Sequence, residues 1–114
     1  MLINALIVFT ITAVGGLILA AKVLSGKQAS WAVSIVHALL GAAGLVMLGM
    51  TVLEGTGSSR VTAALALLVV AALGGFYLAS IHLKGKVAPK SVVIIHAGVA
   101  VAGFLTLASV VFGL

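Results

Sequence analysis

Four long apolar runs occupy almost the whole chain and limit the folds that it can adopt. They cover about residues 2–24, 30–53, 61–83 and 90–112 and are joined by short connections. A helix of roughly 20 apolar residues crosses a hydrocarbon layer about 30 Å thick, so each run is long enough to span a membrane. The chain has only six basic residues and one acidic residue among its 114 positions. We therefore predict an all-α fold, a four-helix transmembrane bundle that forms a single domain over residues 1–114.

The positions of the basic residues predict the orientation of this bundle in the bilayer. The formal net charge is +5, and five lysines flank the connections near residues 22–30 and 83–90: Lys22, Lys27, Lys84, Lys86 and Lys90. Because basic connections tend to stay in the cytoplasm, we expect these two connections to be cytoplasmic and both termini external, in an inner or plasma membrane. The same lysines could also meet anionic lipid or the carboxylates of a cofactor, and we expect no nucleic-acid partner. The first basic residue, Lys22, follows the first apolar run, so we expect residues 1–24 to be a retained helix and not a signal peptide.

The second half of the chain repeats the first at an offset of 59 residues. Aligned without a gap, residues 15–48 and 74–107 are identical at 15 of 34 positions, and the offset pairs His37 with His96. We predict two tandem helix-hairpin repeats. They cover about residues 1–55 and 60–114. A unit of two spans returns the chain to its starting side, so the hairpins are expected to be related by a pseudo-two-fold axis along the membrane normal, with both histidines at one depth.

His37 and His96 are the strongest candidates for a binding site, because an ionisable side chain inside a membrane helix is costly and usually faces the bundle interior. Small residues follow each histidine on the same helix face, four and seven positions later: Gly41, Gly44, Ala100 and Gly103. Two glycine pairs on the other helices lie at nearly the same depth: Gly15, Gly16, Gly74 and Gly75. Together these residues predict a space beside the imidazoles for a wide, flat ligand.

Haem is the flat ligand that two opposed imidazoles suit best. Neutral imidazoles can take both axial positions of one iron, which gives an electron-transfer centre without an open position for oxygen. Cysteine is absent, which excludes thiolate and iron–sulfur sites, and a dinuclear metal site would need more carboxylates or histidines. We predict one haem b with its iron bound by His37 and His96. Its propionates are expected to point to the lysine-bearing end, toward His82, Lys27 and Lys86.

Residues 37–41 (HALLG) and 96–100 (HAGVA) resemble the haem-binding helices of b-type membrane cytochromes, in which small residues follow a histidine at short helical intervals. The resemblance covers the two histidine-bearing helices. The resemblance implies an electron-transfer protein, or a subunit of a respiratory or redox assembly, in preference to a stand-alone enzyme. A redox protein or a quinone is the implied partner, in a homo-oligomer or a larger membrane complex. Such cytochromes often hold several haems and use more histidines, so the one symmetric pair here implies a single haem.

Two other functions are compatible with the sequence. In a non-catalytic scaffold or accessory subunit, each histidine would bond a backbone carbonyl or the other histidine. A small four-span transporter of the multidrug-resistance type has a similar length, but that family relies on a carboxylate within its first helix. The only carboxylate side chain here, Glu54, lies at a helix end. The 59-residue offset pairs His82 with Val23, so the first repeat has no histidine that corresponds to His82. We therefore expect His82 to have a structural role at the membrane interface.

Overall fold

The computed structural model describes residues 1–55 and 57–114, and all the regular structure in these ranges is α-helical. The four helices are α1 (Leu2–Leu24), α2 (Trp31–Leu53), α3 (Ser59–Leu83) and α4 (Lys90–Val111). Each is long and apolar enough to cross a membrane. The prediction of an all-α chain with four candidate spans is confirmed, and no helix end differs from the predicted one by more than two residues.

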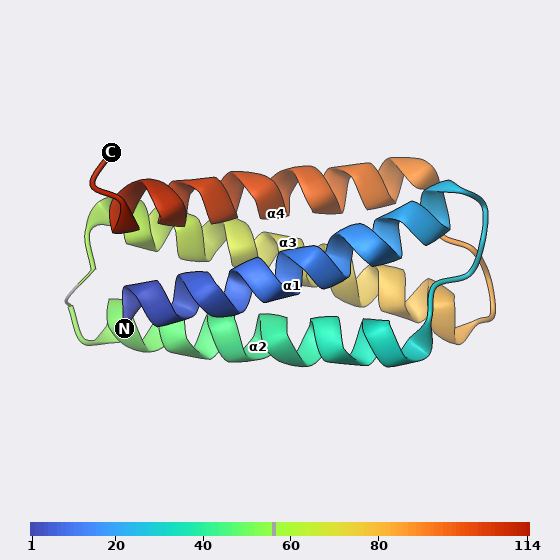
Figure 1. Ribbon diagram of the computed structural model, residues 1–114, viewed down its shortest axis with the longest axis horizontal. Coiled ribbons are helices and arrows are strands. Elements are labelled where there is room, and N and C mark those ends of the chain that lie inside the picture. The colour runs from blue at the N-terminus through green and yellow to red at the C-terminus, as the bar shows by residue number, and fades with distance from the viewer. Residues whose placement is uncertain (56) are drawn as a thin grey trace.

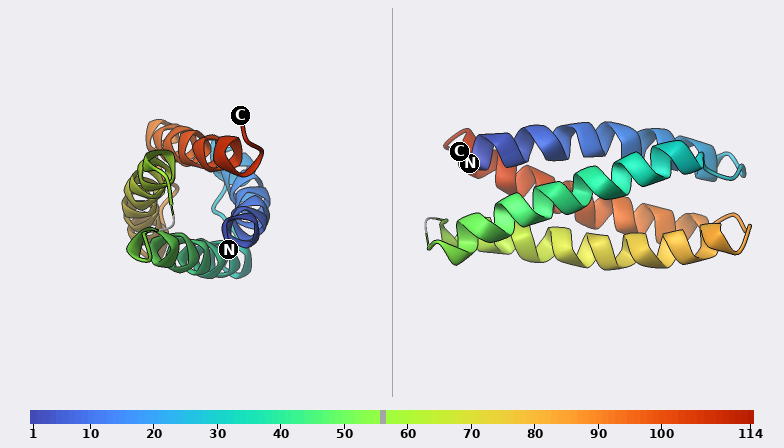
Figure 2. Two further views of the ribbon diagram at one scale, coloured as in Figure 1. Left: turned by 90° about the vertical axis from the view of Figure 1, so that its left-hand side faces the viewer. Right: turned by 90° about the horizontal axis from the view of Figure 1, so that it is seen from below.

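The helices run antiparallel in an elongated bundle of 42 × 21 × 19 Å (Figure 1). Seen from its end, the bundle is a square in which α1 packs against α2 and α4, and α3 packs against the same two helices (Figure 2). α2 and α4 therefore occupy opposite corners. Both termini, the end of α2 and the start of α3 lie at one end of the bundle (Figure 1). The two lysine-bearing connections lie at the other end (Figure 1), which is called the lysine end below.

Local sequence explains why the helices stop and start at the lysine end. Gly26 and Gly85 follow the ends of α1 and α3 with φ of 82° and 71°, a left-handed conformation that favours glycine. The amide of the next residue, Lys27 or Lys86, donates to the carbonyl five residues earlier at 3.0 and 3.3 Å, as in a Schellman cap. Ser30 then caps α2 by accepting a hydrogen bond from a first-turn amide at 3.4 Å.

Buried apolar side chains are concentrated in the half of the bundle that contains the termini. All four helices contribute to this cluster: Ala5, Leu6, Phe9, Leu48, Val61, Ala64, Leu68 and Leu107. Thr12 and Ala71 are buried at the middle of the bundle. Beyond them toward the lysine end, Val93 is the only apolar side chain among the described residues that is buried. The interior is thus closely packed on one side of the histidines and sparsely packed on the other.

Candidate functional site

The two imidazoles meet at the centre of the bundle. His37 reaches inward from α2 and His96 from α4, the helices at opposite corners of the square. Their ring centroids are 6.4 Å apart, and the ring planes make an angle of 78°. The structure therefore brings together the two histidines that the repeat pairs, and it places them edge to face.

A backbone carbonyl of the neighbouring helix holds each imidazole. The Nδ1 atom of His37 lies 2.8 Å from the carbonyl oxygen of Thr12, and the Nδ1 atom of His96 lies 2.7 Å from that of Ala71. A carbonyl oxygen can only accept, so Nδ1 must donate its proton, and in a neutral ring Nε2 then keeps its lone pair. In the part of the chain that the structure describes, neither Nε2 atom has a hydrogen-bond partner. Both imidazoles are thus fixed in the tautomer that ligates a metal through Nε2.

Glycine pairs give the imidazoles access to these carbonyls. Gly15 and Gly16 lie three and four residues after Thr12, where side chains would stand beside its carbonyl. A Cβ on Gly16 would lie 2.9 Å from His37 Cε1, and one on Gly15 would lie 3.7 Å from His37 Cβ. The ring of His37 therefore packs directly on the bare backbone of α1.

The second hairpin has the same arrangement. Gly74 and Gly75 lie three and four residues after Ala71, and a Cβ on Gly75 would come within 3.2 Å of His96 Cε1. One on Gly74 would lie 3.5 Å from His96 Nδ1. All four of these glycines were predicted to border a flat ligand. In the structure they contact the imidazoles themselves.

The small residues that follow the histidines lie in different surroundings from those predicted. A Cβ on Gly44 would lie 2.7 Å from the ring of Phe9, and one on Gly103 would lie 2.8 Å from Leu68. Side chains of the neighbouring helix, and not open space, thus face these two buried glycines. Gly41 has looser surroundings, because a Cβ there would lie 3.7 Å from a methyl group of Thr12. Ala100, the fourth of these residues, is half-buried.

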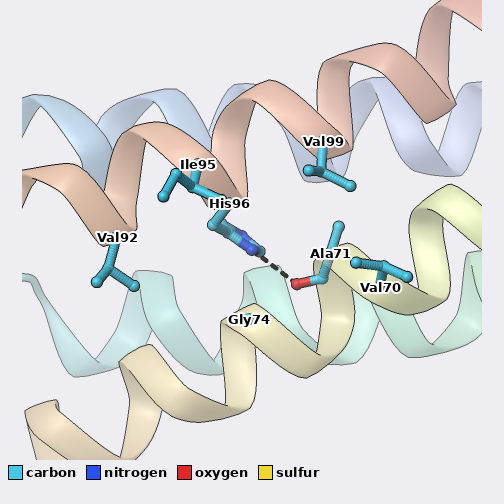
Figure 3. Close-up of a pocket in the computed structure, with 7 residues that line it drawn as sticks. All are labelled: Val70, Ala71, Gly74, Val92, Ile95, His96 and Val99. Carbon is cyan, nitrogen blue, oxygen red and sulfur yellow. Dashed lines mark hydrogen bonds between the residues drawn. The ribbon is translucent and has the colours of Figure 1, made fainter.

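A pocket of about 290 Å³ opens between α3 and α4 beside one of the imidazoles (Figure 3). Its lining consists of Val70, Ala71, Gly74, Val92, Ile95, His96 and Val99. The ring of His96 extends from α4 across the gap to the Ala71 carbonyl, between apolar side chains of both helices (Figure 3). This volume is at the lower end of the range for small-molecule pockets, so a ligand as wide as a porphyrin does not fit in it.

The third histidine belongs to the lysine end and not to the central pair. His82 stacks on Trp31 with ring centroids 3.8 Å apart and planes within 8° of parallel. Its carbonyl accepts a hydrogen bond from Gln28 Nε2 at 3.4 Å, and its own buried Nε2 has no partner among the described residues. Lys27 and Lys86 are exposed on the adjacent connections.

Sequence reasoning identified the histidines and, in the scaffold alternative, a backbone carbonyl as their partner, but it did not identify the carbonyls of Thr12 and Ala71. The hydroxyls of Thr10 and Thr12 bond their own helix, each 2.8 Å from a carbonyl four residues earlier. The second role of Thr12, through its carbonyl, was not predicted. The sequence did contain a signal for these two partners, because a glycine pair follows both Thr12 and Ala71 three and four residues later. No family model, curated protein or solved structure was found to match this chain.

Proposed function

We propose that this protein is a membrane-embedded b-type cytochrome that transfers electrons through one haem, with His37 and His96 as the two axial ligands. The observation that carries the proposal is the 6.4 Å separation of the two ring centroids. An imidazole nitrogen lies about 2 Å from a bound metal and its ring centre about 1 Å further, so two imidazoles on one iron have centres about 6 Å apart. The existing separation therefore equals the one that bis-histidine ligation requires, and the rings, now edge to face, would have to turn so that both Nε2 atoms pointed at the iron.

The donor set also suits haem better than a bare metal ion. No group of three or more His, Cys, Asp or Glu side chains able to hold a metal occurs within residues 1–55 and 57–114. A haem iron already has four porphyrin nitrogens and needs only two protein ligands. The bonds from Nδ1 to the Thr12 and Ala71 carbonyls would fix the ring orientations and raise the basicity of Nε2. Bound haem would supply a one-electron carrier that has no free position for oxygen.

The porphyrin would occupy the half of the interior between the histidines and the lysine end, where few apolar side chains are buried. A porphyrin could extend to Gly44 and Gly103 only if the side chains of Phe9 and Leu68 moved. Its propionates must leave the apolar interior, and the lysine end supplies positive charge through Lys27, Lys86 and their neighbours. We propose that this end is cytoplasmic, in an inner or plasma membrane, and that a redox protein or a quinone exchanges electrons with the haem.

We further propose that the two hairpins are related by a pseudo-two-fold axis along the membrane normal. The support for this axis is the agreement between the two histidine contacts. The carbonyl partners Thr12 and Ala71 are 59 residues apart, as are His37 and His96. The axis would pass between the rings, which is the arrangement expected for two ligands of one iron.

An absorption spectrum of the purified protein tests the haem proposal directly. Low-spin, six-coordinate haem b gives sharp α and β bands on reduction, and extraction of the haem should yield one per chain. A colourless protein from cells with ample haem would reject the proposal.

The second candidate is a non-catalytic scaffold or accessory subunit, which the bonds from the imidazoles to the carbonyls favour. These bonds join the two helices of each hairpin and would explain both histidines without a cofactor. They leave the two Nε2 atoms, and the approach of the two rings to 6.4 Å between centroids, without a role. A small transporter is less supported, because Glu54 lies at the C-cap of α2 and not within a span.

A further inference from the structure

The structure places the first lysine-bearing connection and the start of α2 against the end of α3, where the second lysine-bearing connection begins. Gln28, in the first connection, donates to the carbonyl of His82 near the end of α3. Trp31, at the start of α2, stacks on the His82 ring. Lys27 precedes Gln28 and Lys84 follows His82 by two residues, so each connection carries a lysine close in sequence to this contact.

Three lysines lie within four residues of this contact along the chain, and they are called the lysine cluster here: Lys27, Lys84 and Lys86. All three are exposed. The backbone positions of Lys27 and Lys86 are fixed by the hydrogen bonds that close the turns at Gly26 and Gly85. The lysine cluster is thus carried on ordered turns.

No acidic side chain compensates the lysine cluster. The only one in the chain, Glu54, is at the C-cap of α2, at the opposite end of the bundle. Five lysines belong to the lysine end, so even the two propionates of a haem would leave an excess of three positive charges there. Converging like charges repel, and an anion that bridges the two connections would remove this repulsion.

We propose that the lysine cluster binds the phosphate of an anionic phospholipid headgroup, which bridges the two connections. A phospholipid is the anion that the position of the site favours, because the four apolar helices end here and a half-exposed tryptophan, Trp31 at 44%, lies beside the cluster. Tryptophan is typical of the level of the headgroups, and basic clusters next to a span attract anionic lipid. The inference does not rest on the haem, because none of its contacts involves His37 or His96.

The chain carries its own probe for this site, because Trp31 is its only tryptophan. The protein is reconstituted in phosphatidylcholine bilayers that contain a small fraction of lipid with brominated acyl chains, which quench tryptophan at short range. The brominated lipid is phosphatidylglycerol in one sample and phosphatidylcholine in the other, so only the headgroup differs. We expect the anionic lipid to be enriched at Trp31 by at least about fivefold, the value for one lysine near an anionic surface. Equal quenching by both lipids would overturn the proposal.

Matched variants separate a site at the lysine cluster from a general attraction by positive charge. Lys27→Gln with Lys86→Gln should abolish most of the preference, and Lys27→Arg with Lys86→Arg should keep it. Lys22→Gln with Lys90→Gln removes the same charge from the same end and should also keep most of it. Equal losses in the two glutamine pairs would show a diffuse effect and no bridging site. Millimolar inorganic phosphate should leave the quenching unchanged, and displacement of the lipid by it would assign the site to a free anion instead.

Discussion

His37 and His96 approach each other edge to face, with ring centroids 6.4 Å apart, although 59 residues separate them in the chain. Each ring is anchored on the neighbouring helix of its own hairpin, so the approach depends on how the two hairpins pack together. This relationship leads to the following predictions.

Removing either central histidine should remove the haem. In His37→Ala or His96→Ala, one axial ligand is lost, and we expect the sharp reduced α and β bands to disappear or weaken severely. His82→Ala is the matched control, because His82 stacks on Trp31 and does not belong to the central pair. Absorption spectra of the three purified variants at equal protein concentration provide the measurement. Unchanged bands in both central variants would show that His37 and His96 are not the axial ligands.

Gly16→Ala should disturb the anchored imidazole of His37. The new methyl group would lie 2.9 Å from His37 Cε1, so the ring would have to move and its bond to the Thr12 carbonyl would weaken. Overpacking of this kind costs about 1–3 kcal/mol, which should lower the thermal unfolding temperature in detergent. Gly75→Ala should have a similar but smaller effect, because a Cβ there would lie 3.2 Å from His96 Cε1.

Gly49→Ala is the control for both substitutions, because nothing lies within 4 Å of a Cβ at this position. It should be neutral or slightly stabilising, since alanine favours a helix more than glycine does. If Gly16→Ala were as harmless as Gly49→Ala, the close packing of His37 on α1 would be disproved.

Gly44 and Phe9 should behave as a coupled pair. A methyl group on Gly44 would lie 2.7 Å from the Phe9 ring, so Gly44→Ala should destabilise the bundle even without haem. Phe9→Leu removes the ring atoms that clash, and the double variant should be more stable than the sum of the two single effects predicts. Thermal unfolding of the four proteins gives the coupling energy. Simple additivity would mean that this contact does not form.

The lysines should set the orientation in the membrane. Reporter fusions after Leu114 and within the α2–α3 connection should give an external signal, and tags next to Lys27 or Lys86 should be cytoplasmic. Accessibility of single introduced cysteines to an impermeant reagent is an independent measurement, because the chain has no cysteine of its own. The opposite orientation would show that the lysines bind a ligand or a partner and do not set the orientation of the protein in the membrane.

The sequence alone determined the helices and the residues that could form a site. Apolar runs of sufficient length, with glycine turns at Gly26 and Gly85 and a serine cap at Ser30, are local features, and the helices agree with them to within two residues. The 59-residue offset likewise paired His37 with His96 without reference to any contact. Such features are readable because each depends on residues that are close together in the chain.

Only the tertiary structure decided what those residues touch. The bonds from His37 to Thr12 and from His96 to Ala71 each join positions 25 residues apart. The covering of Gly44 by Phe9 likewise joins two different helices. Such contacts depend on how far each helix is rotated about its axis and how it is shifted along its neighbour. These helices are apolar on nearly every side, so no polar face in the sequence indicates which side turns inward. The contacts between the four helices, including those of the two imidazoles with the neighbouring carbonyls, therefore fix the inward side.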